Sequence, residues 1–141
     1  MKPINTTIII ILLVLNSCAV TRKQNCNCEL KENWEKCIEG QWESNEDTRF
    51  TLSFKKGKVI WSYKHTSGIV ECEVYDYFFS NTSCDLKYFD RNSDNNIFIN
   101  YVSNKDTMCY EITSFTNKHF TYIWTTRPNI QSFNRIYSPC K

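Results

Sequence analysis

A two-residue alternation of apolar and polar side chains constrains this chain more than any other feature of its sequence. It begins after Gly40, is clear over residues 50–54, and recurs over residues 120–124 near the end of the chain. Successive side chains of a β-strand point to opposite faces, so this rhythm indicates strands with one buried face. Further alternating runs cover residues 59–63, 69–79, 97–101, 110–112 and 130–137.

Turn signals separate these runs at short intervals. Lys56-Gly57 and Ser67-Gly68 stand between the first three runs, and polar residues at 81–83, 104–106, 117–118 and 127–129 separate the others. Eight or nine short strands without helical crossovers indicate an antiparallel up-and-down arrangement, folded as a barrel or as a sandwich. A closed barrel leaves no strand edge open, and at this strand number its interior holds side chains or one small ligand.

A short helix is predicted ahead of the strands, over residues 29–39. Leu30, Trp34, Cys37 and Ile38 follow the spacing of one helical face. Acidic residues stand early in this segment and Gly40 ends it. We expect the helix to plug the sheet with its apolar face rather than to bind a partner.

The first residues predict export from a bacterial cytoplasm. Residues 8–15 form an apolar run after a basic start, which is too short to cross a bilayer and typical of a signal-peptide core. The next residues, Leu15-Asn16-Ser17-Cys18, are similar to a bacterial lipobox, in which the cysteine is lipidated and becomes the first residue. An ordinary secretory signal, cleaved near Ser17-Cys18-Ala19, is the alternative.

The lipobox hypothesis divides the chain into a signal peptide (1–17), a lipidated tether (18–28) and one domain (29–141). Acyl chains such as palmitate on Cys18 would hold the protein on a membrane, and Ala19 favours the outer membrane by analogy with other lipoproteins. The 141 residues leave room for one domain. The formal charge is only +2, and basic and acidic residues are intermixed along the chain. The sequence therefore predicts no basic surface of the kind that binds nucleic acid.

Eight cysteines agree with export, because exported proteins this rich in cysteine usually carry disulfides. Besides Cys18 they are Cys26, Cys28, Cys37, Cys72, Cys84, Cys109 and Cys140. No metal site is predicted, because paired C-x-x-C spacings are missing and Cys26-x-Cys28 has no nearby histidine. If Cys18 is lipidated, seven cysteines remain for disulfides. Because seven is an odd number, one cysteine stays free or pairs between chains. Among the open connectivities we favour Cys84 with Cys109, and one N-terminal cysteine with Cys140.

Two short motifs frame the alternating region: Gly40-Gln41-Trp42 at its start and Asn134-Arg135-Ile136 at its end. With the lipobox, the helical lead-in, and Cys109-Tyr110-Glu111-Ile112 followed by Ser114-Phe115-Thr116, this order resembles the lipocalin-like lipoproteins of Bacteroidetes-type bacteria. The resemblance implies an all-β, antiparallel up-and-down barrel of eight to nine strands with a short N-terminal helix. It also implies closure by Gly40, Trp42 and Arg135, with the arginine stacked across the plugging tryptophan for ~1 kcal/mol.

Residue patterns typical of catalysis are missing. His65 and His119 lie at predicted strand ends without a fixed partner, which favours a surface position over a general base. Glu71 and Glu73 share a strand face with the tyrosines that follow them. Because two buried unpaired charges are costly, these glutamates line an exposed mouth of the barrel, pair with a cationic group of a ligand, or mark a bulge that reverses the alternation; we favour the mouth or the bulge. The sequence shows neither a nucleophile-elbow serine nor a Gly-rich phosphate loop, so no enzyme and no cofactor are predicted.

Aromatic residues on the alternating faces give the clearest functional signal. The stripe includes Tyr101, and we identify as candidate ligand-binding residues Trp61, Tyr63, Tyr75, Tyr77, Tyr110, Tyr122 and Trp124. These rings either fill the interior or line an apolar pocket with hydroxyl groups at its rim. Two functions stay open: a membrane-anchored binder of a small hydrophobic molecule, and a disulfide-stapled platform that binds or inhibits another envelope protein.

Overall fold

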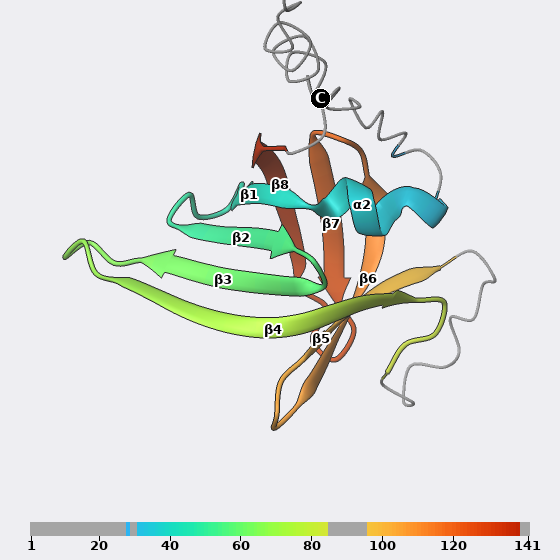
Figure 1. Cartoon of the computed structure of the whole chain (residues 1–141). Helices are drawn as coiled ribbons and strands as arrows, with labels where there is room; N and C mark the ends of the chain where they lie inside the picture. The colour runs from blue at the N-terminus through green and yellow to red at the C-terminus, as the bar shows by residue number, and fades with distance from the viewer. Residues whose placement is uncertain (1–27, 29–30, 85–95, 139–141) are drawn as a thin grey trace, which may run out of the picture.

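Eight antiparallel strands follow one another in sequence order around a closed barrel, because β1 pairs with both β2 and β8 (Figure 1). The computed structural model describes residue 28 and residues 31–84 and 96–138. The strands are β1 (Gly40–Ser44), β2 (Phe50–Lys55), β3 (Lys58–Lys64), β4 (Val70–Ser80), β5 (Ile97–Val102), β6 (Thr107–Phe115), β7 (His119–Trp124) and β8 (Ile130–Tyr137). The antiparallel up-and-down barrel that the alternation predicts is therefore confirmed, with eight strands.

The helix ahead of the barrel is shorter than the sequence predicts. A 3-10 turn, η1 (Lys31–Asn33), leads into α2 (Trp34–Ile38), while residues 29 and 30 lie outside the described part. The indole ring of Trp34 stacks on Phe115 with the ring centroids 5.0 Å apart, and Ile38 is fully buried. Helix α2 thus lies against one end of the barrel, which we call the closed end.

Glycine is required at two backbone positions. Gly40, with φ of 131°, joins α2 to β1 in a conformation that side chains with a Cβ rarely adopt. Lys56 (φ 49°) and Gly57 (φ 75°) form the two-residue connection between β2 and β3. Positive φ at both positions is what a type I′ hairpin turn needs, and its twist matches that of the paired strands.

Aromatic rings fill the interior next to the closed end. Phe120 is fully buried and stacks on Phe133 with the ring centroids 4.8 Å apart. Trp42 meets the edge of Phe120 at 4.8 Å, and Leu52 beside them is also fully buried. Buried aromatic rings contribute ~25 cal/mol per Å² of apolar area removed from water, which makes this layer a main source of stability.

Trp42 and Arg135 close the barrel at the junction of its first and last strands. They are paired residues in the β1–β8 ladder, and the guanidinium carbon of Arg135 lies 4.2 Å from the Trp42 ring centroid. The indole N–H of Trp42 donates to the carbonyl of Ile38 at 2.7 Å. Arg135 donates to the carbonyls of Cys37 and Glu39, the second at 3.4 Å. The stacking expected from the resemblance is thus present, and the arginine also holds the end of α2.

Two disulfides are formed by described residues. Cys84 and Cys109 are bonded, as the sequence analysis favours, and Cys28 is bonded to Cys37. The first bond fastens the segment after β4 to the outer face of β6, and the second fastens the chain before the helix to α2. Cys72 is a free cysteine, whereas Cys18, Cys26 and Cys140, including the predicted pairing of Cys140, lie outside the described residues.

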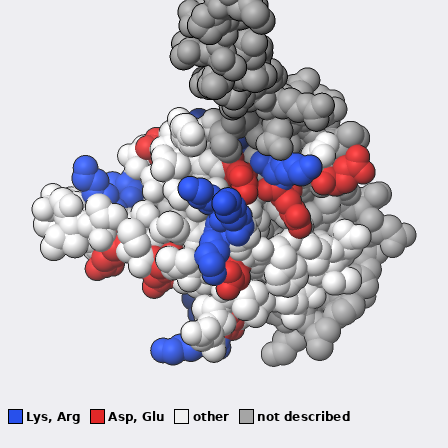
Figure 2. All heavy atoms as spheres, viewed as in Figure 1, with Lys and Arg blue, Asp and Glu red and all other residues white. Residues whose placement is uncertain are grey.

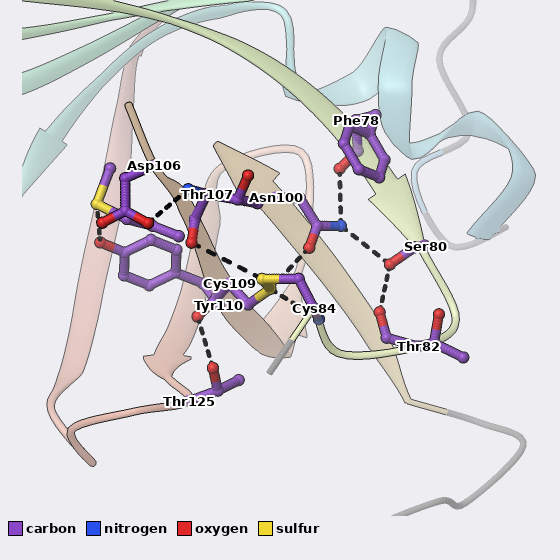
Figure 3. The surroundings of a disulfide bond; sticks show 11 residues. Phe78, Ser80, Thr82, Cys84, Asn100, Asp106, Thr107, Cys109, Tyr110 and Thr125 are labelled. Atoms are coloured by element: carbon purple, nitrogen blue, oxygen red, sulfur yellow. Dashed lines mark hydrogen bonds between the residues drawn. A yellow bond between two sulfur atoms is a disulfide. The ribbon is translucent and has the colours of Figure 1, made fainter. Parts of the chain in front are cut away.

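Asn100 links three strands beside the disulfide of Cys84 and Cys109 (Figure 3). Its side chain is 1% exposed, and its Nδ2 donates to the Ser80 hydroxyl at 2.9 Å and to the Phe78 carbonyl at 3.5 Å. Its Oδ1 lies 2.9 Å from Sγ of Cys109. Buried amides are retained where their hydrogen bonds are made, so this network fixes the register of β4 against β5.

Replacing Trp42 tests the closure. Trp42→Ala should lower the free energy of unfolding by ~3–5 kcal/mol, because it removes a fully buried ring, its hydrogen bond and the stacking partner of Arg135. Trp34→Ala, which removes a partly buried ring at the same end, should cost less. Urea unfolding followed by far-UV circular dichroism measures both. Equal losses for the two variants would show that Trp42 has no special part in closure.

Candidate ligand-binding site

The candidate site lies at the distal end, which we define as the end opposite α2, formed by the connections 45–49, 65–69, 103–106 and 125–129. Strands β3 to β7 send aromatic side chains inward there. We call this group the distal cluster; it consists of Trp61, Tyr75, Tyr101, Tyr110, Tyr122 and Trp124. Strand alternation places them on the inner face, next to the filled layer of the closed end.

The rings of the distal cluster pack around Tyr110. Its ring centroid lies 4.4 Å from that of Tyr122, 5.2 Å from that of Tyr101 and 6.0 Å from that of Trp124. Trp61 meets the edge of Tyr101 at 5.5 Å. Tyr101 and Tyr122 are fully buried, whereas Trp61 and Trp124 are partly buried. The cluster is therefore closed on the barrel side and reaches solvent only through its outer members.

Four polar atoms of this cluster are buried without a hydrogen-bond partner: the hydroxyls of Tyr101 and Tyr122 and the indole nitrogens of Trp61 and Trp124. The hydroxyls of Tyr101 and Tyr122 lie close enough to influence each other's ionisation. An unpaired buried donor costs ~1–3 kcal/mol, and native proteins contain few of them. Four in one cluster therefore call for a specific explanation.

The electrostatic environment of the cluster keeps its hydroxyls neutral. Burial raises the pKa of Tyr101 and Tyr122 well above 10, and the nearby hydroxyl of Tyr110 adds to this effect at both residues. Burial also raises the pKa of Tyr110 above its usual range. At neutral pH these groups are hydrogen-bond donors and acceptors without charge, and the indole N–H groups can only donate.

Charged side chains surround the mouth of the barrel beside the cluster. Glu71 lies 3.2 Å from the imidazole of His65, and Glu73 accepts a hydrogen bond from the Tyr75 hydroxyl. Burial and this carboxylate together raise the pKa of Tyr75 to about 12. The β3–β4 ladder runs without a register shift, and both glutamates are exposed. The structure therefore shows exposed glutamates at the mouth and no bulge in this ladder.

The structure brings five of the seven candidate ligand-binding residues together. Tyr77 lies nearer the closed end, where its ring meets Phe54 at 5.1 Å. Tyr63 lies at the rim, where the Arg49 guanidinium stands 5.2 Å from its ring centroid. Tyr101 is not among the seven, yet it sits within the cluster and touches four of its rings. The inward parity of residues 97, 99 and 101 is the signal that could have identified it.

Three hollows formed by described residues lie on the outside of the barrel. The first, of about 140 Å³, is bounded by Phe98, Glu111 and Ile123 on the outer faces of β5, β6 and β7. The second lies against Thr51 and Ser62 on β2 and β3. The third hollow lies where β5 separates from the edge of β4.

Among residues 28, 31–84 and 96–138, no three His, Cys, Asp or Glu side chains are grouped so that they could hold a metal ion. In the same part of the chain, no helix has the length and apolar character needed to cross a membrane.

Comparison of the chain with protein-family models, curated proteins and solved structures finds no match.

The buried tyrosines predict an alkaline loss of stability. In the unfolded chain Tyr101 and Tyr122 titrate near 10, whereas in the folded protein both pKa values are well above 10. As the pH rises through 10 the unfolded state therefore binds fewer protons. Stability that is complete well below pH 10 is lost, and the loss approaches ~1.4 kcal/mol per pH unit for each tyrosine once the unfolded chain is fully ionised.

Urea unfolding between pH 9 and 11 measures this loss, with the double variant Tyr101→Phe/Tyr122→Phe as the reference. The variant isolates the two tyrosines, because Arg135, whose pKa burial lowers to about 10, titrates in both proteins. Over this whole pH range we expect the natural protein to lose ~3 kcal/mol more than the variant. Parallel pH profiles would contradict the burial of the two hydroxyls.

Proposed function

We propose that this protein is a lipid-anchored, lipocalin-like protein of the bacterial cell envelope that binds a small apolar molecule at the distal end of its barrel. The observation that carries the proposal is the set of four unpaired buried donors on Trp61, Tyr101, Tyr122 and Trp124. An apolar ligand with hydrogen-bond acceptors would pair them. The proposal includes no catalytic step.

The chemistry of the cluster restricts the ligand. Indole N–H groups only donate, so the ligand has to present acceptor atoms such as carbonyl, ether or carboxylate oxygens. The surrounding rings offer apolar and aromatic contact, with centroid spacings of 4.4 to 6.4 Å. Because the cluster raises the pKa of its own tyrosines, a negative charge buried there is disfavoured unless several donors reach it. A compact apolar body with neutral acceptors fits these conditions best.

Entry has to occur between the outer members of the cluster. Trp61, Tyr75 and Trp124 are partly buried, whereas Phe120 and Phe133 behind the cluster are fully buried and stacked. Rotation of the outer rings would admit a ligand without disturbing the closed end. The closed end of the barrel would then provide stability, and the distal end would bind the ligand.

Tyrosine-to-phenylalanine exchange tests the site. Tyr101→Phe/Tyr122→Phe should raise the free energy of unfolding of the ligand-free protein by ~1 kcal/mol or more, because two unpaired buried hydroxyls disappear. The same variant should bind an aromatic ketone probe, such as benzophenone, several-fold more weakly. Tyr77→Phe removes a hydroxyl outside the cluster and serves as the matched control.

Calorimetric titration and quenching of tryptophan fluorescence measure probe binding at neutral pH. Binding that is equal in the natural protein and in Tyr101→Phe/Tyr122→Phe would exclude the hydroxyls as ligand contacts. Absence of binding by any apolar acceptor probe would instead favour a purely structural interior.

An interaction role is the second candidate, and it has its own supporting observation. The outer face of β3 and β4 exposes apolar side chains, which are Ile60, Val70, Val74 and Phe78. Contiguous exposed apolar residues of this kind are typical of protein contacts. The two roles use different surfaces, so one does not exclude the other.

The proposed anchor depends on the sequence before the domain. Residues 1–27, including the lipobox and Cys18, lie outside the described part of the structure. Cys18→Ser should move the protein from the membrane to the soluble fraction, because three acyl chains at ~0.8 kcal/mol per buried methylene hold a lipoprotein almost permanently. Fractionation with immunoblotting measures this, and Cys72→Ser is the control. Membrane retention of Cys18→Ser would remove the lipobox hypothesis.

A further inference from the structure

Strand β4 is paired with both neighbouring strands only at Asp76. Residues 70–76 pair with β3, whereas on its other side only residues 76–80 pair with β5. In Figure 1 the β3–β4 hairpin accordingly reaches away from β5 and β6. We call residues 70–75 of β4, on the side away from β3, the free edge.

The backbone groups at the free edge can be assigned from the ladder. The N–H of Tyr77 donates to the carbonyl of Gly57, so residue 77 directs its backbone groups toward the β3 side. Alternate residues of an antiparallel strand direct these groups to opposite sides. Val70, Cys72 and Val74 therefore present their N–H and C=O groups at the free edge, where no described strand pairs with them.

The side chains along the free edge differ between its two faces. Val70 and Val74 are 53% and 57% exposed on the outer face, next to Ile60. Glu71 and Glu73 are exposed on the inner face. Figure 2 shows acidic atoms along the lower margin of the projecting hairpin. A strand that adds to this edge would therefore meet valines on one face and carboxylates on the other.

Charge decides between two possible occupants. In a second copy paired about Cys72, the alternating pattern would set Glu71 opposite the partner's Glu73, and the reverse, on the same face. Like charges directly opposite one another destabilise a strand pair. A partner strand with lysine or arginine opposite Glu71 and Glu73 would instead form cross-strand ion pairs. Its apolar residues would lie opposite Val70 and Val74.

We propose that the free edge of β4 binds an extended segment of a partner protein in which basic and apolar residues alternate. The segment adds a strand, and the main-chain groups of Val70, Cys72 and Val74 supply its hydrogen bonds. A hollow of about 330 Å³ at the inner end of the edge, beside the Lys58–Asp76 ion pair, receives the end of the segment. Six edge residues at ~3.3 Å each match a segment of five or six residues.

Fluorescence anisotropy with the soluble domain and labelled peptides tests the proposal. A seven-residue peptide of alternating lysine and valine should bind, and the same peptide with glutamate for lysine should not. Glu71→Gln and Glu73→Gln should each weaken binding two- to fivefold, whereas Glu43→Gln on β1 should leave it unchanged. Affinity for the natural domain should also fall as salt is added.

Backbone methylation of the peptide provides a control that leaves the protein untouched. N-methyl groups on the residues that face the edge should abolish binding, and N-methyl groups on the alternate residues should be tolerated. Equal binding of the two methylated peptides would overturn strand addition. Dimerisation of the domain that Val74→Pro prevents, seen in analytical ultracentrifugation, would assign the edge to a second copy and overturn the basic partner.

Discussion

The fold depends on one contact between distant parts of the chain, the stacking of Arg135 on Trp42. This contact joins β1 to β8 and ties both strands to the carbonyls at the end of α2. A guanidinium is suited to the position because its planar face covers the indole while its N–H groups reach two carbonyl oxygens. Burial lowers the pKa of Arg135 to about 10, so the charge persists at neutral pH. Without it, α2 would lose its attachment to the last strand.

From this closure the barrel divides into an end optimised for packing and an end that is chemically incomplete. Beside α2, Phe120, Phe133 and Trp42 make ring contacts and the indole N–H of Trp42 is paired, while Nε of Arg135 is buried there without a partner. At the distal end, two tyrosines and two tryptophans keep unpaired polar atoms. Local departures from good packing and complete hydrogen bonding are expected where a protein binds something. At the same end β4 separates from β5, so backbone N–H and C=O groups of β4 are left without a described strand to pair with.

Much of this architecture could be predicted, because strand periodicity and turn chemistry are local properties. Lys56-Gly57 and the alternation over residues 50–54 and 59–63 identify the first hairpin directly. The splaying of β4 could not be predicted, since strand register depends on how the whole barrel closes. The Cys28–Cys37 bond is likewise a product of three-dimensional proximity, whereas the inward position of Tyr101 follows from strand alternation. The bond of Cys84 with Cys109 is the pairing that we favour among the connectivities that the sequence leaves open.

The position of Arg135 has a consequence for how the chain reaches this structure. The arginine meets the carbonyl of Glu39 across 96 positions of sequence. During synthesis, β1 therefore cannot pair with β8 until nearly the whole domain has been synthesised. Contacts of such high order slow folding, because the loop-closure entropy is lost before the contact compensates it. The export proposed from the lipobox would suit this topology, because β1 and β8 of a chain translocated unfolded would pair only after translocation.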